Sequence, residues 1–468
     1  MASVDKIHEP TDPTEPQAAA RIRRLGFRYS WLALLALWLV YAMNANMRNF
    51  FFVVQPSIVS EFHVTPGELG LFAGFVTLAQ AVLALPASTW SDRGLHGWGR
   101  KFREVPLALG YMIFSVLTGV AALTQGFWNI FVLQAIKNMF GGAGEAVEVT
   151  AVAEWWPIER RGFAQGLHHT GYPWGTLIGG VAVAGILGTF GSQNWRYVFL
   201  ILPWFTIPAL LFYWFFSTRD RYKVFLQGTK AAGLTPPLLG GIDSDDTHHV
   251  PAGATRRALA NPNVLVSAIC SGLGLAIYVG IGFWLPLYLA FVANYDFARV
   301  AAYSVIFTIT GGIGQIMWGA VSDRLGRKYT LIICFLWLTV GVLLLQLTHI
   351  GLGWLIGVQL FAGLATNGIY PVLYAFSSDS SEEGAIAIGN GLQMVGQGIG
   401  GLSPIVLGWL IALGGGFHSR TGFNYGLYFL AALVLLAAIL MALFTRESIG
   451  IFKDRDRAMV RKESCNVA

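Results

Sequence analysis

Four ionisable side chains lie inside apolar stretches that are long enough to cross a lipid bilayer. Arg48 lies in the first of these stretches, and Lys137, Glu145 and Glu148 lie in the fourth. A charge at the centre of a bilayer costs about 2.5–3.5 kcal/mol on insertion scales, so each of these residues requires a partner or a function. On a helix Lys137 and Glu148 project within about 20° of each other, because their spacing is about three turns. One face of the fourth stretch therefore presents a cation and, deeper, carboxyl groups.

This set of side chains has the chemistry to bind an anion and to carry a proton. An arginine offers a planar fork of N–H groups that matches a carboxylate, so Arg48, together with Lys137, is expected to bind an anionic substrate. A carboxyl group in a low-dielectric setting favours its neutral form, so Glu145 or Glu148 is expected to carry a proton. A proton on either acid weakens its attraction for a nearby cation, which would couple protonation to substrate binding. The alternative is an internal ion-pair network that only locks helices together.

Polar side chains in other apolar stretches are further candidates for a substrate site. Asn390, Gln393 and Gln397 fall on one helix face at spacings i, i+3 and i+7, where they would line a wet cavity or bond across helices. The neighbouring His168 and His169 point about 100° apart on a helix, which makes a poor metal chelate, so we expect packing or cavity-lining roles for them. The remaining predicted substrate-binding residues are Tyr41, Asn46, His169, Asn367 and Tyr370.

The elements that must position these residues are twelve apolar stretches. Hydrophobic residues make up 55% and charged residues only 12% of the 468 residues, whereas soluble domains carry about 25% charge. This composition excludes a water-soluble enzyme and a disordered chain. Helices are predicted throughout, because lipid offers the backbone no hydrogen-bond partner. The predicted spans are 30–58, 69–90, 105–124, 128–156, 162–190 and 196–217, then 263–292, 300–321, 329–347, 352–378, 386–413 and 424–445.

The predicted fold is an all-α membrane protein with twelve transmembrane helices in two pseudo-symmetric six-helix bundles. The bundles comprise 30–217 and 263–445, joined by a polar linker at 218–262. The tails at 1–29 and 446–468 are polar. No short apolar segment with a cleavage site precedes the first span, so we expect that span to be retained.

The basic residues follow the spans in a regular alternation. They gather in both tails, in the linker and in every second loop, whereas the other loops hold only Arg196, Arg299 and Arg420. The positive-inside rule then predicts that both termini are cytoplasmic in a multi-pass protein of the cell membrane. The net charge of +6 therefore indicates membrane topology and not nucleic-acid binding. The three cysteines form no disulfide or metal pattern, and no metal or other cofactor is expected.

A charged motif occurs at the same place in both halves. Ser91-Asp92-Arg93 with Gly99-Arg100-Lys101 follows the second span, and Ser322-Asp323-Arg324 with Gly326-Arg327-Lys328 follows the eighth. Internal symmetry is typical of secondary transporters, in which two halves rock about a central site. A carboxylate at a helix end can accept hydrogen bonds from helix N-termini or arginines and so keep one side of the transporter closed. The alternative is that these charges only anchor helices at the lipid headgroups. The predicted gating residues are Asp92, Arg93, Arg100, Lys101, Asp323, Arg324, Gly326, Arg327 and Lys328.

These motifs resemble those of a known family. Gly319-x-x-x-Asp323-Arg324-x-Gly326-Arg327-Lys328 resembles the loop signature of the major facilitator superfamily, and the two sets of six spans cover nearly the whole chain. Arg48 resembles the first-span arginine of the anion:cation symporter branch, which includes sugar-acid and sialic-acid carriers. Lys137-x-x-x-Gly141-x-x-x-Glu145, followed by Trp155-Trp156-Pro157-x-Glu159-Arg160, is similar to the fourth-span pattern of that branch. The resemblance implies the major facilitator fold and transport by alternating access.

We therefore expect a secondary active transporter that imports a small carboxylate or sugar acid together with a proton. Its partners would be the anionic substrate, protons and the lipid bilayer, and we expect a monomer that binds no nucleic acid. Two alternatives stay open. One is a carrier for neutral sugars or polyols, or a drug exporter, in which the cations merely pair with the glutamates; the other is a non-transporting membrane sensor. An enzyme is not expected, because no nucleophile–base set or metal spacing occurs.

Overall fold

The computed structural model describes residues 15–83, 87, 97–124, 126–157, 160–237, 253–381, 386–448 and 451. Within these residues every regular element is a helix. Helices satisfy their backbone hydrogen bonds internally, which is what an apolar sequence in lipid requires.

The first half of the chain contains the helices that carry Arg48 and the fourth-span charges. A single long helix, α1, runs from Glu15 to Phe62 and so begins well before the first predicted span. The other main helices of this half are α2 (Pro66–Ala79), η1 (Gly97–Arg100) with α4 (Lys101–Thr124), α5 (Phe127–Glu154), α6 (Arg161–His169) with α7 (Gly171–Phe190), and α8 (Arg196–Ile201), η4 (Leu202–Phe205) and α9 (Thr206–Phe216).

The second half repeats this order after two short helices. Within the predicted linker lie α10 (Arg219–Ala231) and α11 (Ala254–Ala260). The helices that follow are α12 (Pro262–Phe291), α13 (Phe297–Tyr303) with α14 (Phe307–Leu325), α15 (Arg327–Leu344) with η5 (Leu345–His349), α16 (Leu352–Thr366) with α17 (Ile369–Ser380), α18 (Ile386–Gly400) with α19 (Ser403–Leu413), and α20 (Arg420–Phe444).

Among the residues that the structure describes, ten helical segments are long and apolar enough to cross a membrane. They occupy the positions of every predicted span except the second and the fourth. Helix α5 has 28 residues, but Lys137, Glu145 and Glu148 lower its apolar character. Helix α2 has 14 described residues, and 84–86 and 88–96 lie outside the described part. The chain is therefore a multi-pass helical membrane protein, and the full count of twelve stays a prediction.

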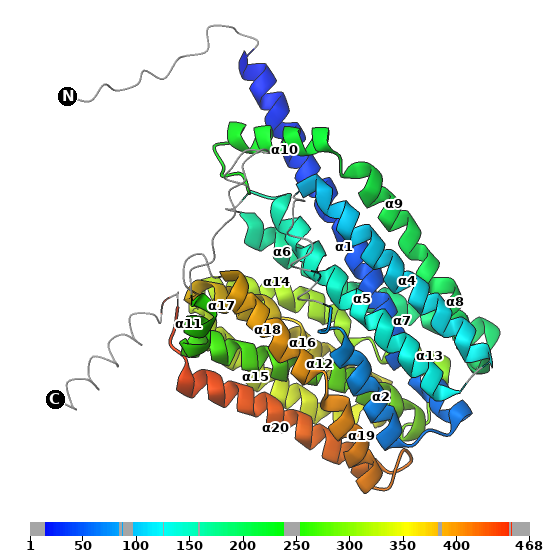
Figure 1. The fold of residues 1–468 in the computed structure, drawn as a ribbon. Coiled ribbons are helices and arrows are strands. Elements are labelled where there is room, and N and C mark those ends of the chain that lie inside the picture. The colour runs from blue at the N-terminus through cyan, green and yellow to red at the C-terminus, as the bar shows by residue number, and fades with distance from the viewer. Residues whose placement is uncertain are drawn as a thin grey trace, which may run out of the picture.

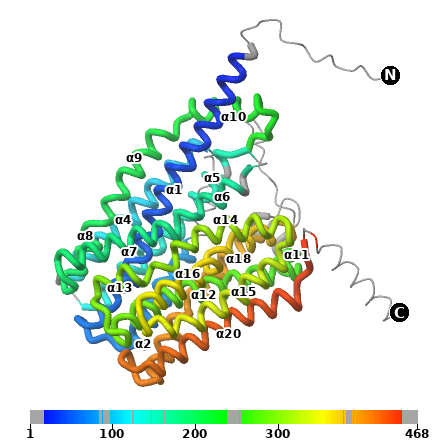
Figure 2. The backbone as a smooth tube through the Cα atoms, turned by 180° about the vertical axis from the view of Figure 1, so that it is seen from behind, coloured from blue at the N-terminus to red at the C-terminus, as the bar shows by residue number. Residues whose placement is uncertain are grey.

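The two halves pack side by side along one continuous interface (Figures 1 and 2). Helix α2 packs against α19 and α18, α7 packs against α13 and α14, and α1 packs against α12. Helix α10 lies across the end of the first half and packs on α1, while α11 packs on α12 and α18 of the second half (Figure 1). We call the end that carries α10 and α11 the linker end and the other the opposite end.

Local sequence signals set the helix starts at the loops. Thr65 caps α2: its hydroxyl accepts a hydrogen bond from the backbone N–H of Glu68, and Glu68 accepts one from the backbone N–H of Thr65. Asn261 caps α12 in a similar way, with Pro262 as the first helical residue. Both starts follow the rule that polar caps and a leading proline begin a helix.

Glycines let α2 and α19 approach closely towards the opposite end. A Cβ atom at Gly70 would overlap the carbonyl oxygen of Pro404, and one at Gly408 would overlap the carbonyl oxygen of Pro66. Small residues at such a crossing allow two backbones to touch, as is usual between membrane helices. This crossing is a main contact between the halves, so any motion that parts them at this end must separate it.

Candidate functional site

The centre of the site is an ion pair between α1 and α5. Nη2 of Arg48 lies 2.9 Å from Oε2 of Glu145, and the hydroxyl group of Tyr41 donates to Oε1 of the same carboxylate at 3.1 Å. The guanidinium also lies 5.5 Å from the ring centre of Tyr172 on α7. The side chains of Arg48 and Glu145 remain 15% and 17% exposed. The pair is therefore partly accessible from outside the protein interior.

Helix periodicity explains why Tyr41 and Arg48 act on one partner. Their spacing of seven residues is about two turns, so both side chains project from the same face of α1. That face meets α5, which carries Glu145. An aromatic ring beside the guanidinium adds an attraction of about 0.5–1 kcal/mol at exposed sites and more when desolvated. Arg48 is thus contacted by Glu145 from α5 and by the Tyr172 ring from α7.

Lys137 lies close to Arg48 but has a different environment. Its side chain is fully buried, and its ammonium group donates a hydrogen bond of 3.0 Å to the carbonyl oxygen of Met47. The same ammonium lies 5.5 Å from the ring centre of Tyr111 on α4. Lys137 therefore binds the backbone immediately before Arg48. In this geometry it supports the part of α1 that carries the arginine.

Glu148 lies about one turn after Glu145 along α5 and is fully buried. The amide of Asn44 donates to its Oε2 at 3.5 Å, and Nε2 of His168 lies 3.6 Å from its Oε1. The His168 ring stacks on the Tyr41 ring with centroids 4.6 Å apart. Tyr41 therefore contacts both the Glu145 carboxylate and the histidine beside Glu148. The two acids predicted to carry protons belong to one continuous polar cluster.

Second-half residues face this cluster across the interface. The His169 ring lies 6.2 Å from that of Tyr374 on α17, and its Nδ1 contacts the carbonyl oxygen of Gln165 at 2.8 Å. The amide of Gln397 on α18 donates to Tyr374 at 3.1 Å and to Ser271 on α12 at 2.8 Å. Gln397 therefore links α18 to α12 through Ser271. It also bonds Tyr374, the residue that faces His169 of the first half.

The other predicted substrate-binding residues occupy mixed positions. Gln393 is fully buried and donates to the carbonyl oxygen of Leu373, so it bonds α18 to α17. The amide nitrogen of Asn367 and the hydroxyl of Tyr370 are buried without a hydrogen-bond partner among the described residues. Asn46 is buried against Gly179 of α7. The side chain of Asn390 lies outside the described residues.

The first copy of the charged motif forms a clasp at the linker end. The guanidinium of Arg100 donates to both carboxylate oxygens of Glu154, at 3.0 and 2.6 Å, and the backbone N–H of Gly97 donates to the same group at 2.6 Å. The ammonium of Lys101 donates to the carbonyl oxygens of Trp214 and Ser217. The start of the third span is thus bound to the ends of the fourth and sixth.

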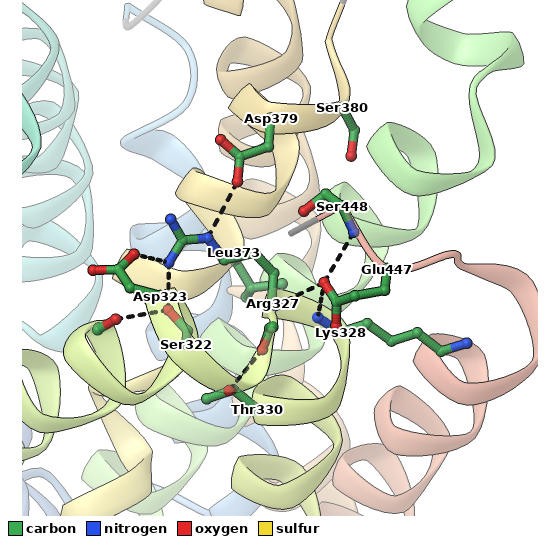
Figure 3. A network of polar contacts seen from close by, with 12 residues as sticks. Ser322, Asp323, Arg327, Lys328, Thr330, Leu373, Asp379, Ser380, Glu447 and Ser448 are labelled. Atoms are coloured by element: carbon green, nitrogen blue, oxygen red, sulfur yellow. Dashed lines mark hydrogen bonds and ion pairs between the residues drawn. The ribbon is translucent and has the colours of Figure 1, made fainter. Parts of the chain in front are cut away.

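The second copy forms the same clasp in the other half (Figure 3). The guanidinium of Arg327 contacts Asp379, at the end of α17, at 3.2 Å, and Asp323 at 2.6 Å. The ammonium of Lys328 donates to the carbonyl oxygen of Thr445, just after α20, at 2.8 Å. The start of the ninth span is therefore bound to the ends of the tenth and twelfth. The internal repeat seen in the sequence is a repeat of side-chain contacts.

A carboxylate caps the helix that begins inside the second motif. Glu447 accepts hydrogen bonds from the backbone N–H groups of Arg327, Lys328 and Tyr329, at 2.8, 3.3 and 3.3 Å (Figure 3). An acid at a helix N-terminus satisfies unpaired donors and the helix dipole. Gly326 has φ +113°, a conformation that favours glycine, and it separates α14 from α15. This explains the glycine of the motif.

These contacts bear on the predicted gating residues. Each bond just described lies within one half of the molecule. Arg324 is exposed, and its carbonyl oxygen accepts from the N–H of Ile451. Asp92 and Arg93 lie outside the described residues. The motif clamps helices within each half in this state, and its gating role stays a prediction.

Some residues of the site were not singled out from the sequence. Glu104 on α4 is fully buried, yet it directly precedes the predicted third span and so counted as part of a loop. Asn44 and Tyr172 were missed because their neighbours come from other helices. One signal was available for Tyr172: it lies three residues after His169, and so on the same side of the fifth span.

The chain matches other proteins over most of its length. The family model described as Major Facilitator Superfamily matches residues 37–309 and 294–456. A putative metabolite transport protein of Haemophilus influenzae is 23% identical over 82% of this chain and 89% of its own. A probable sulfoacetate transporter of Cupriavidus necator, SauU, is 25% identical over 88% and 92%. The glucose-6-phosphate exchanger SLC37A2 of Xenopus laevis is 26% identical over 70% and 72%.

A solved structure has the same fold. It is a bacterial homologue of the human lysosomal transporter Spinster in an inward-facing and occupied conformation, with a TM-score of 0.66, 18% identity, and coverage of 89% of this chain and 96% of that one. The low identity limits this likeness to the fold. Together with the family match over most of the chain, the repeated motif and the paired helical bundles, it leads to one assignment: this protein belongs to the major facilitator superfamily.

Proposed function

We propose that this protein is a secondary active transporter that imports a small organic anion together with a proton, by alternating access. The observation that carries the proposal is the partly exposed Arg48–Glu145 pair between α1 and α5 of the first half. Two of the similar proteins are named for sulfoacetate and for glucose 6-phosphate, which are both anions. The proposed substrate class is therefore a small carboxylate, sulfonate or sugar phosphate.

Charge balance at the pair explains how a proton would be coupled to the anion. Arg48 and Glu145 together are neutral. An anion that joined them alone would leave a net negative charge in a low-dielectric site, which is unfavourable. For a singly charged anion, a proton on Glu145 restores neutrality, because the guanidinium then pairs with the substrate and the protonated acid has no charge; a doubly charged anion would also need the positive charge of Lys137. The neutral site accepts anion and proton together and releases them together.

Neighbouring residues have distinct roles in this scheme. Tyr41 donates to Glu145 and would keep the acid oriented after its bond to Arg48 breaks. Lys137 would hold the backbone at Met47, and thus position Arg48. Tyr374 and Gln397 would contact the uncharged part of the substrate from the second half, and His169 would contact it from the first half.

The packing between the halves suggests which side is open in this state. The glycine crossing of α2 and α19 lies towards the opposite end. We therefore propose that this conformation opens to the linker end. By the positive-inside rule, the basic residues at that end support the proposal that it faces the cytoplasm, with both termini on the same side of the cell membrane. Transport would then require the clasped halves to rock and to part at this crossing.

A neutral substrate is the second candidate. It is favoured by the observation that both cations already have partners, since Arg48 pairs with Glu145 and Lys137 binds the Met47 carbonyl. In that case the pair would hold helices together, and a sugar or polyol would bind through the polar residues alone. The two candidates differ in whether an anion displaces Glu145 from Arg48.

Uptake into proteoliposomes distinguishes these functions. Radiolabelled sulfoacetate and glucose 6-phosphate serve as anionic probes, and glucose serves as the neutral one. We expect uptake of an anion, inhibition by carboxylates, a fall when the pH gradient is dissipated, and loss in Arg48→Ala. Intact anion uptake in that variant would refute the anion site. Inhibition by uncharged sugars alone would establish the second candidate.

A further inference from the structure

A buried acid on α4 has no role in the scheme above. Glu104 is 0% exposed, and neither of its carboxylate oxygens has a hydrogen-bond partner among the described residues. Burying an ionised carboxylate without a partner is far more unfavourable than burying the neutral acid. Apolar residues fill buried positions without this penalty. A glutamate here therefore requires either a partner or a proton.

Glu104 points at the stretch of α5 that carries the proton-binding acids. A Cβ atom built at Gly144 would lie 3.6 Å from its Oε1 and 3.8 Å from its Oε2, so the carboxyl group fills the space beside that glycine. Glu148 lies four residues after Gly144, on the same face of α5. Glu148 is also fully buried, and its Oε1 accepts no hydrogen bond among the described residues. The Glu104 carboxyl group thus lies beside α5 about one turn before Glu148, a second buried acid.

Among the described residues, the charged groups near Glu104 form no ion pair with it. On α9, Tyr213 lies near both acids, and its hydroxyl has no hydrogen-bond partner among the described residues. Arg100 donates to Glu154, and Lys101 donates to carbonyl oxygens of α9 and its end. On the far side of Glu148 lie His168 and Asn44. The nearby cations are engaged elsewhere.

We propose that Glu104 is a proton-holding residue of the transport cycle, which keeps a proton at neutral pH and exchanges it with Glu148. When Glu148 is ionised, a proton that leaves Glu104 is taken up by Glu148, and the reverse transfer restores the first state, because two neighbouring buried carboxyl groups cannot both be ionised. One O–H bond breaks on one acid as one forms on the other, and the number of protons in the pair is unchanged. The pair is a proton store behind the Arg48–Glu145 site. The inference that this store serves transport rests on the proposed function.

Infrared spectroscopy tests the stored proton without any substrate. Purified protein in lipid nanodiscs is compared as wild type, Glu104→Gln, Glu148→Gln and Glu61→Gln at neutral pH. A protonated carboxyl group has a carbonyl band of its own, separate from that of a carboxylate. We expect wild type to show buried, slowly exchanging absorption of this kind, and Glu104→Gln to lose the part contributed by Glu104 while any band of protonated Glu148 remains. In Glu148→Gln the band should remain but move, because its neighbour has changed.

Glu61 serves as the control for the infrared comparison, because its ion-pair partner is known. Glu61 forms an ion pair with Arg196 at the opposite end, and its removal should leave the band unchanged. Glutamine has nearly the shape of a neutral glutamic acid, so Glu104→Gln should fold and melt close to wild type; Glu104→Asp provides a second variant that retains an acid. An unchanged band in Glu104→Gln, with correct folding, would refute the proposal that Glu104 holds a proton.

A transport assay tests the use of the proton. In Glu104→Gln we expect pH-gradient-driven uptake of the anionic probe to fall by about 100-fold, as on loss of a proton-transfer group, whereas exchange at equal pH falls far less. Unchanged gradient-driven uptake would overturn the role in transport. If wild type itself shows no proton-driven uptake, the proposed function fails, while the infrared result still decides whether Glu104 holds a proton.

Discussion

Replacing Glu145 by glutamine tests the coupling scheme most directly. The substitution imitates the protonated acid, since it removes the charge and keeps the shape of the side chain. In the wild type at high pH, an anion must displace the Glu145 carboxylate from Arg48 before it binds. In Glu145→Gln no such displacement is needed. We therefore expect the variant to bind an anionic probe at high pH as the wild type binds it at low pH.

The geometry of the pair sets the expected magnitude. Nη2 and Oε2 are 2.9 Å apart, and both side chains are more than four-fifths buried. A hydrogen bond between charged groups contributes about 1.5–3 kcal/mol. At about 1.4 kcal/mol for each factor of ten, the variant should bind the anion roughly 10- to 100-fold more tightly at high pH. At low pH the two proteins should converge.

The assay is a binding titration across a range of pH. Intrinsic tryptophan fluorescence or thermal shift of protein in nanodiscs gives the dissociation constant for sulfoacetate and for glucose 6-phosphate. Glu61→Gln is the matched control, because it also breaks a Glu–Arg pair, but at the opposite end. It should lower the melting temperature and leave the pH dependence of binding intact.

One result would refute the reasoning. If Glu145→Gln keeps the wild-type pH dependence, or binds the anion more weakly at high pH, then Glu145 does not compete with the substrate for Arg48. The loss of pH-driven accumulation in this variant, with exchange retained, would be the matching transport result. Loss of both would instead indicate that the pair only holds α1 to α5.

Other predictions test the supporting contacts. Arg48→Lys keeps the charge but not the planar fork, so we expect anion uptake between those of wild type and Arg48→Ala in the liposome assay. Lys137→Gln keeps an N–H donor for the carbonyl that it binds and should retain more uptake than Lys137→Leu; equal loss in both would point to direct contact with the anion. Gly70→Leu should part α2 from α19, which spin-label distances between these helices would detect as a longer or broader distribution. Arg327→Ala and Asp379→Ala, measured singly and together by thermal unfolding, should give a coupling energy of about 0.5–3 kcal/mol, and additive effects would contradict the clasp.

The sequence predicts the framework of this protein because lipid restricts the choices. The composition and the length of the apolar stretches indicate membrane helices, and ten of the predicted spans have matching helices of sufficient length and apolar character. The repeated motif predicts equivalent positions in two halves, and the clasps of Arg100 and Arg327 form at those positions. Charges inside spans indicate where the unusual chemistry lies.

The partners of those charges were not predictable from the sequence. Angles along one helix place Lys137 and Glu148 on one face of α5, but the hydrogen-bond partner of each comes from α1. The cation that meets a carboxylate is Arg48, because the vertical offset between α1 and α5 brings it level with Glu145. Glu104 was missed because the predicted third span begins at residue 105, one residue after this buried acid. Relative heights of helices depend on side-chain packing across the whole bundle.

Each of the two clasps binds helix ends within one half of the molecule. In each half, the arginine and lysine of the motif bind helix ends of that same half, and no clasp described above crosses residues 238–252. A backbone nick in that segment would sever none of them. Two co-expressed fragments, divided there, should therefore associate in the membrane and form the helical scaffold. Chimaeras that combine one half of this protein with the other half of a different superfamily member would then be a practical route to new substrate specificity.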